Sequence, residues 1–207
     1  MLTWTPKLDA SWDCPKHAMA ASIWNSTLEE FRAQLAGRDP IPAGVSVAAV
    51  SASLTLSLLI KVVEITRRRA DFQGDPAKIE ELLASAQAES KKLAQCADED
   101  SAAFAEYMAS RRTPNEAAAL RRAIEVPLRA ARAAASGLRF CADSAAITPA
   151  SMAPDLGTAA LLLRASVRAI LLSVESNALR LTDPEFQDQV RHEVDDLKHL
   201  AKNHQPW

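Results

Sequence analysis

VSVAAVSASLTLSLLI, residues 45–60, is the stretch that decides the fold of this chain. It is the longest weakly polar run in the sequence, and apolar or small residues would cover every side of the helix that it forms, up to Lys61. A helix that is apolar all round is buried in a protein core or spans a membrane. This run is short for a bilayer span and carries five Ser or Thr residues. We therefore predict a long, buried central helix and no membrane partner.

The composition of the whole chain favours helices in the same way. Of its 207 residues, about one in five is alanine, five are glycine and 5% are aromatic. Alanine is the best helix former, whereas tight turns and phosphate-binding loops depend on glycine. A chain of this length is most simply one domain. The prediction is an all-α, single-domain bundle, and the scarcity of glycine argues against Rossmann and P-loop enzymes.

The net charge and the cysteines indicate which kinds of partner and which cellular compartment to expect. The net charge of −2 provides no global field that would attract nucleic acid. The three cysteines, Cys14, Cys96 and Cys141, are odd in number and lack CxxC spacing. Such usage fits buried, reduced thiols better than a disulfide framework, and no secretory signal is visible. We expect a cytoplasmic protein without a nucleic-acid partner.

Helix start and stop signals divide the chain into about six helices. Capping residues occur at Ser26–Glu30, at Asp75-Pro76 and at Thr113–Glu116. The predicted helices cover residues 26–37, 45–69, 75–111, 113–139, 155–181 and 183 onward. A proline inside a helix removes one backbone hydrogen bond, so we predict a kink at Pro127.

Residues 1–24 differ from the helical domain, which we place at 25–207. They contain Trp4, Trp12 and Trp24, two prolines and no sustained period. Exposed tryptophan is unfavourable, so this N-terminal arm is expected to lie across the body or on a partner. A partly ordered tail is the alternative.

The acidic triplet Asp98-Glu99-Asp100 is the first candidate for chemistry. On a helix, Asp100 shares a face with Phe104, and a carboxyl group on an apolar face titrates upward into the range useful for proton transfer. Spacing alone favours the alternative, an exposed acidic turn. Both interpretations stay open at this point.

Two further groups of polar residues are candidates for a site. Lys61 and Glu64 interrupt the most apolar helix, and a buried ion pair, a ligand contact or emergence into solvent would each explain them. His192 and His199 lie with acidic residues on the last helix, where such pairs arise by chance on a charged face. We predict no metal site.

Taken together, five segments resemble one known family. They carry a proline–glycine loop that opens a helix, an acidic turn, and three later motifs: Pro40–Ala49, Ala97–Phe104, Glu125–Leu128, Pro154–Ala160 and Ser173–Asn177. In this order on an all-α chain they are similar to the cyclodeaminase/cyclohydrolase family of folate one-carbon metabolism. The resemblance covers about residues 26–202 and leaves the N-terminal arm outside.

The resemblance implies a homodimeric enzyme whose substrate is a tetrahydrofolate derivative and which holds no permanently bound cofactor. Members close formiminotetrahydrofolate with release of ammonia, or interconvert methenyl- and formyltetrahydrofolate with water. Both reactions need proton transfer to nitrogen at a tetrahedral carbon. Asp100 matches the general acid/base. The implied substrate-binding positions are Gly44, Ser46, Lys61, Glu64, Asp155, Gly157 and Asn177. Candidates for a basic rim facing the glutamate tail are Arg67–Arg69, Lys91, Lys92 and Arg111.

Departures from the family pattern define the alternative function. Three consecutive glycines are usual where this chain has Ala43-Gly44-Val45, and valine is excluded from backbone conformations that glycine reaches at positive φ. Pro154 and Asn115 also replace usual pocket residues. These changes imply altered chemistry, an inactive member that binds a folate-like or other small molecule, or an enzyme for another cyclic or amidine-like substrate.

Overall fold

The computed structural model describes residues 22–203, and every regular element among them is a helix. The α-helices are α1 (Leu28–Leu35), α2 (Gly44–Arg67), α3 (Pro76–Ser110), α4 (Glu116–Ala145), α5 (Ala153–Ala178) and α6 (Pro184–Asn203). Two short 3₁₀ helices, η1 (Ile23–Asn25) and η2 (Ala150–Met152), precede α1 and α5. The predicted all-α fold with six helices is confirmed.

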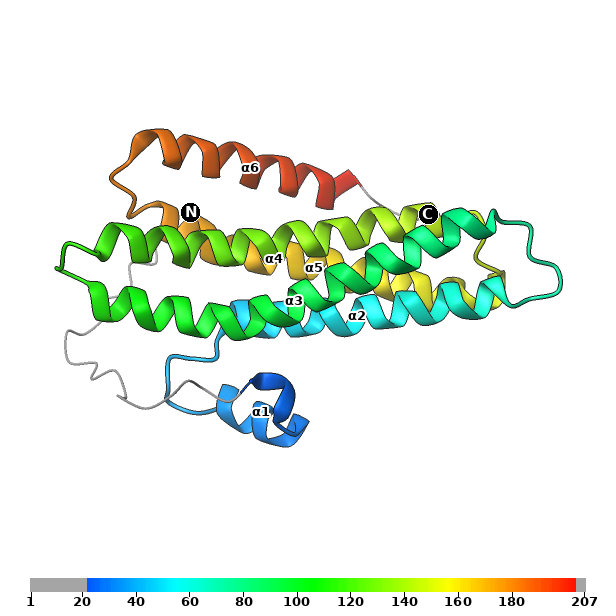
Figure 1. Ribbon diagram of the computed structural model, residues 1–207, viewed down its shortest axis with the longest axis horizontal. Coiled ribbons are helices and arrows are strands. Elements are labelled where there is room, and N and C mark those ends of the chain that lie inside the picture. The colour runs from blue at the N-terminus through cyan, green and yellow to red at the C-terminus, as the bar shows by residue number, and fades with distance from the viewer. Residues whose placement is uncertain (1–21, 204–207) are drawn as a thin grey trace.

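Helices α2 to α5 form an antiparallel four-helix bundle (Figure 1). Each packs on its neighbours in the order α2, α3, α4, α5 and back to α2, while α6 covers α4 and α5 on one side. Small residues let these helices approach closely: a Cβ atom on Gly137 of α4 would lie 2.8 Å from Leu56 Cδ2 and 2.9 Å from Leu163 Cδ1. The core therefore depends on alanine and glycine as much as on leucine.

Helix α2 is buried as the sequence predicts, except on one face. Leu56, Leu59 and Val62 are fully buried, whereas Val47, Leu54 and Ile65 are exposed. The α2 helix and the segment Ala150–Ala178 are long and apolar enough to cross a membrane by length and composition. More than half of the α2 window is nevertheless buried against other helices, as expected for a core helix.

Some helix ends agree with the predicted capping residues and others do not. Thr27 and Glu30 form the predicted capping box, and Asp75 accepts a hydrogen bond from the Ala77 amide at 2.9 Å. The predicted start at Thr113 is wrong, because Thr113–Asn115 form a turn and the helix begins at Glu116. Helix α4 also continues past the predicted end at residue 139, to Ala145, and it stays helical on both sides of Pro127.

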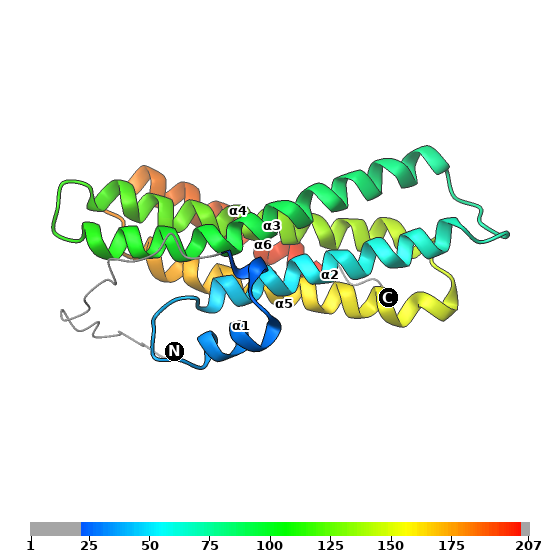
Figure 2. The same ribbon diagram turned by 60° about the horizontal axis from the view of Figure 1, so that its bottom comes forward.

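Most of the predicted N-terminal arm, including Trp4, Trp12 and Cys14, lies outside the described residues. Of the arm, residues 22–24 are described, and the side-chain nitrogen of Trp24 donates a hydrogen bond to the Ala94 carbonyl oxygen at 3.0 Å. Helix α1 follows and lies beside the bundle, separate from its four-helix core (Figure 2). The two other cysteines, Cys96 and Cys141, are free and buried, as predicted.

Candidate active site

The loop before α2 places glycine next to open space. Pro40, Ile41, Ala43 and Gly44 line a cavity where this loop meets α2. No described glycine has a positive φ, and a Cβ atom on Gly44 would meet nothing within 4 Å. Backbone strain and packing therefore do not require glycine at this position. Its missing side chain leaves space on the cavity side, which suits close approach of a ligand.

The three acidic residues of the triplet on α3 have different surroundings. Asp98 accepts hydrogen bonds from Ser22 and from the Ile23 amide. Glu99 forms an ion pair with Arg129 of α4. The carboxyl group of Asp100 faces the cavity, together with Phe104 one turn later. The interpretation of the triplet as a simple exposed turn is therefore wrong for Asp100.

The cavity has a volume of about 400 Å³, within the range of small-molecule sites. Three parts of the chain line it: the loop with the first turn of α2, the C-terminal third of α3, and the end of α5. The lining residues are Pro40, Ile41, Ala43, Gly44, Val45, Asp100, Phe104, Leu172, Ser173, Ser176 and Asn177. Asp100 is the one ionisable side chain among them.

Burial governs the protonation of Asp100. Desolvation raises the pKa of its carboxyl group from 3.8 to about 6, against the lowering effect of a hydrogen bond from Ser46. Ser46 is fully buried, and its Oγ lies 3.2 Å from the Ala97 carbonyl oxygen and 3.5 Å from Asp100 Oδ2. Ser46 therefore contacts Asp100 from the protein interior and does not itself line the cavity. Near neutral pH such a carboxyl group can both accept and return a proton.

Asn177 is held in place at the α5 side of the cavity. Its Nδ2 donates to the Ala123 carbonyl oxygen at 3.2 Å, and its Oδ1 accepts from Arg180 Nη1 at 3.2 Å. The same guanidinium nitrogen of Arg180 also donates to the Ser176 carbonyl oxygen. These contacts fix the orientation of the Asn177 amide and bring a cation to the edge of the cavity.

Four other predicted substrate-binding residues lie away from this cavity. Lys61 and Glu64 follow Gly44 by 17 and 20 residues along α2, which at 1.5 Å per residue is about 25–30 Å. Asp155 and Gly157 occupy the first turns of α5, and the cavity lies at the end of that helix. Because α2 and α5 are antiparallel, all four belong to the opposite end of the bundle (Figure 1). Their role in binding stays a prediction.

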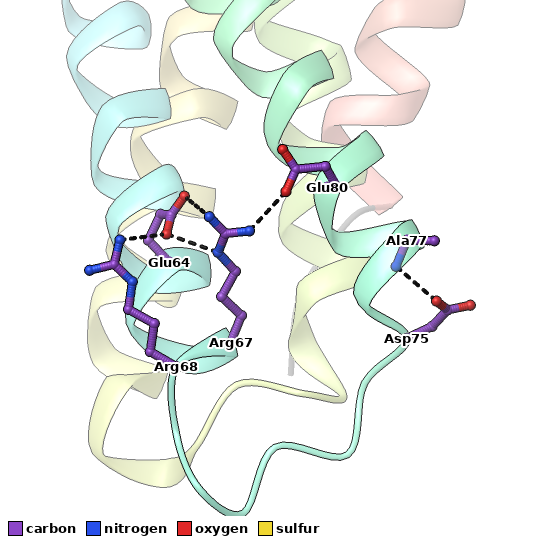
Figure 3. A network of polar contacts seen from close by, with 6 residues as sticks. All are labelled: Glu64, Arg67, Arg68, Asp75, Ala77 and Glu80. Atoms are coloured by element: carbon purple, nitrogen blue, oxygen red, sulfur yellow. Dashed lines mark hydrogen bonds and ion pairs between the residues drawn. The ribbon is translucent and has the colours of Figure 1, made fainter.

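Glu64 is engaged in a charged network at that far end. Its carboxylate pairs with Arg67 at 2.8 Å and with Arg68 at 3.3 Å, and Arg67 also reaches Glu80 of α3 at 2.8 Å (Figure 3). Glu64 is in an ion pair as one of the three interpretations had it, but the pair with Arg67 is half-buried rather than buried, and Lys61 is exposed to solvent. None of the basic residues proposed for a rim lines the cavity.

Of the α5 residues that line the cavity, sequence reasoning assigned a binding role to Asn177 and to none of the others. Leu172, Ser173 and Ser176 line the cavity beside Asn177. Their spacing of three and four residues is the available signal, because residues so spaced share one helix face. No group of three or more His, Cys, Asp or Glu side chains that could hold a metal ion occurs among residues 22–203.

Comparison with known proteins identifies the family. The sequence profile of formiminotransferase-cyclodeaminase matches residues 27–196. The chain belongs to the formiminotransferase-cyclodeaminase family. Formimidoyltransferase-cyclodeaminase of Rattus norvegicus is 28% identical over 200 residues, and that of Mus musculus is 27% identical. Each alignment covers 91% of this chain but 37% of the relative, so the chain spans little more than a third of their length.

A solved structure supports the fold assignment to this family. The formiminotetrahydrofolate cyclodeaminase of Thermotoga maritima matches with a TM-score of 0.84, covering 88% of this chain and 93% of that chain. The sequence identity is 23%, so this likeness shows the all-α fold of the family. The resemblance stated from sequence motifs is confirmed.

Proposed function

We propose that the cavity binds a tetrahydrofolate derivative that carries a one-carbon unit, and that Asp100 is the general acid/base of a cyclodeaminase or cyclohydrolase reaction. The observation that carries this proposal is a carboxyl group with a pKa of about 6 on the wall of a 400 Å³ cavity. Family membership and the names of the relatives support the choice of substrate.

The ring-closure reaction needs a group that transfers protons between nitrogen atoms of the substrate. In ring closure, N10 of a formimino substrate attacks the formimino carbon and forms a tetrahedral centre between N5 and N10. Asp100 accepts the proton from N10 and delivers one to the departing nitrogen, which leaves as ammonia. A carboxyl group whose pKa lies near the working pH serves both steps. Ser46 keeps Asp100 oriented through its hydrogen bond.

The cyclohydrolase reaction uses the same site with water as the nucleophile. Asp100 takes a proton from the water that attacks the methenyl carbon and returns it to the ring nitrogen whose bond to that carbon breaks. The second proton of the water is released to solvent as the formyl C=O bond forms. The spectroscopic readouts have opposite sign: methenyl absorbance appears in ring closure and disappears in hydrolysis. Purified protein assayed with both substrates distinguishes the two reactions. Lack of turnover of either substrate by folded protein would refute the catalytic proposal.

The alternative function is binding without turnover by an altered member of the family. Val45 lines the cavity beside Gly44, where the family usually has glycine. Its branched side chain changes the shape offered to a ligand, although α2 accommodates it in ordinary helical geometry. Calorimetry with several folates separates binding without turnover from no binding. An unrelated cyclic or amidine-like substrate would be indicated if no folate binds.

We propose that the active form is a homodimer that buries the open face of α2 and α5. Six apolar side chains of these helices are exposed: Val47, Leu54 and Ile65 on α2, and Leu161, Leu162 and Leu172 on α5. Exposed apolar patches of this kind mark interaction sites. Leu172 also lines the cavity, so a partner on this face would lie against the site. The buried free thiols of Cys96 and Cys141 support a cytoplasmic location.

A further inference from the structure

Residues 22–43 leave the bundle and return to it at the cavity. They contain η1, α1 and the loop that supplies Pro40, Ile41 and Ala43 to the cavity wall. Helix α1 lies beside the bundle (Figure 2). Its one buried residue is Phe31. Leu28, on the same helix, is 79% exposed. The apolar residues of this segment that pack against the core are Phe31 and the partly buried Ile23 and Leu35.

Three hydrogen bonds tie the start of this segment to one face of α3. Ser22 Oγ donates to Asp98 Oδ2 at 2.6 Å, and the Ile23 amide donates to Asp98 Oδ1 at 2.8 Å. The third is the 3.0 Å bond from Trp24 Nε1 to the carbonyl oxygen of Ala94. Ala94 and Asp98 are four residues apart, so their acceptors lie one above the other on the helix. Both oxygens of the Asp98 carboxylate are used.

Asp98 and Asp100 connect this attachment to the cavity. They are two residues apart, so their side chains point to different faces of α3. One carboxyl group holds the beginning of the segment, and the other faces the wall that the end of the segment builds. We propose that Asp98 is a positioning residue: by clamping residues 22–24 onto α3, it holds α1 and the Pro40–Ala43 wall over the site.

Loss of the clamp has two consequences that can be measured separately. The segment opens more often, because loss of one hydrogen bond to a charged group shifts an opening equilibrium by roughly tenfold or more. Opening also lets water reach Asp100, whose raised pKa depends on burial. The first consequence is measured at the attachment of residues 22–24 to α3, and the second is measured at Asp100.

The attachment of residues 22–24 to α3 is tested by trypsin cleavage after Arg32 and Arg38, both of which are exposed. Asp98→Asn keeps the shape of the side chain and is expected to speed cleavage about tenfold. Glu106→Gln is the matched control: it neutralises another carboxylate of α3, which pairs with Arg122 and not with residues 22–43. Equal cleavage rates in Asp98→Asn, the control and the wild-type protein would overturn the anchoring role.

The site is tested with a variant that changes no charge. Ser22→Ala/Trp24→Phe removes two of the three hydrogen bonds and leaves the Asp98 side chain itself unchanged. The pKa of Asp100, followed by ¹³C NMR with Asp100→Asn for assignment, is expected to fall below its wild-type value of about 6. A pKa that stays at about 6 while trypsin cleavage accelerates would show that the segment is anchored there without shaping the site, which overturns the proposal.

The catalytic readout rests on the proposed function and is kept separate. With a folate substrate, Asp98→Asn is expected to raise KM about tenfold through the displaced wall. Its kcat is expected to keep its dependence on an acid/base group, because Asp100 is intact. Unchanged KM with accelerated cleavage counts against positioning. Failure of the proposed function would instead appear as no turnover by the wild-type protein, with the trypsin and NMR results unaffected.

Discussion

Asp100→Asn is expected to stabilise the folded chain at neutral pH while removing its acid/base group. In the folded protein the pKa of Asp100 is raised from 3.8 to about 6, with desolvation as the main cause. A carboxyl group whose pKa is raised by folding favours the folded state fully only below its unfolded pKa. That stability is lost as the pH rises through the folded value. Asparagine has nearly the same shape and never ionises.

The size of the effect follows from the two pKa values. A shift from 3.8 to about 6 corresponds to about 3 kcal/mol of unfolding free energy, all of it lost once Asp100 is ionised in both states. About half of this loss falls between pH 5 and pH 8, which is roughly 1.4 kcal/mol. The stability of Asp100→Asn relative to wild type is therefore expected to increase by about this amount across that range.

Urea unfolding followed by circular dichroism at pH 5, 6, 7 and 8 measures this difference. Asp196→Asn, which removes an exposed carboxylate on α6, serves as the matched control for the loss of one negative charge. A stability difference between Asp100→Asn and wild type that is the same at pH 5 and pH 8 would refute the reasoning. It would mean that folding does not desolvate the Asp100 carboxyl group.

Three other predictions test the cavity, its support and the assembly. Gly44→Ala is expected to fold with unchanged stability, since its Cβ would enter open space, and to bind folate more weakly in calorimetry. By contrast, the Cβ of Gly137→Ala would meet two leucines, so its free energy of unfolding in urea is expected to fall by about 1–2 kcal/mol. Ser46→Ala removes a hydrogen bond that lowers the pKa of Asp100, so the inflection of kcat against pH is expected to move to higher pH; an unmoved inflection contradicts this. Leu161→Glu places a charge on the open face of α5 and is expected to yield monomers by light scattering, whereas an intact dimer would exclude this face as the interface.

The helices and their order were predictable because their signals are local. Amphipathic or fully apolar periodicity identified each long helix, and Asp75 and Thr27 mark helix starts that the structure shows. The errors lie at ends where two signals compete. Thr113-Pro114 has the residue types of a cap, yet its Thr hydroxyl closes a turn instead, and the helix starts at Glu116. Such competition is settled by neighbouring packing, which a local pattern does not contain.

The site was predictable only in part, because it is assembled from distant segments. Asp100, Gly44 and Asn177 line the same cavity at one end of the bundle, and Ser46 lies buried next to Asp100. Which member of the acidic triplet faces the cavity depends on how α3 is rotated about its axis. That rotation is fixed by the residues that α2 and α4 present to it. The use of Asp98 to hold residues 22–24 had no sequence signal, because its partners are about 75 residues away.

The direct test of the proposed function is the pH dependence of methenyl absorbance with wild-type protein and Asp100→Asn. We predict that the wild-type chain forms or hydrolyses methenyltetrahydrofolate, with an inflection in kcat near pH 6 from Asp100. Asp100→Asn is predicted to bind the folate and to lose turnover by at least about a hundredfold. Turnover that persists in Asp100→Asn with the same pH profile would contradict the assignment of Asp100 as the acid/base group.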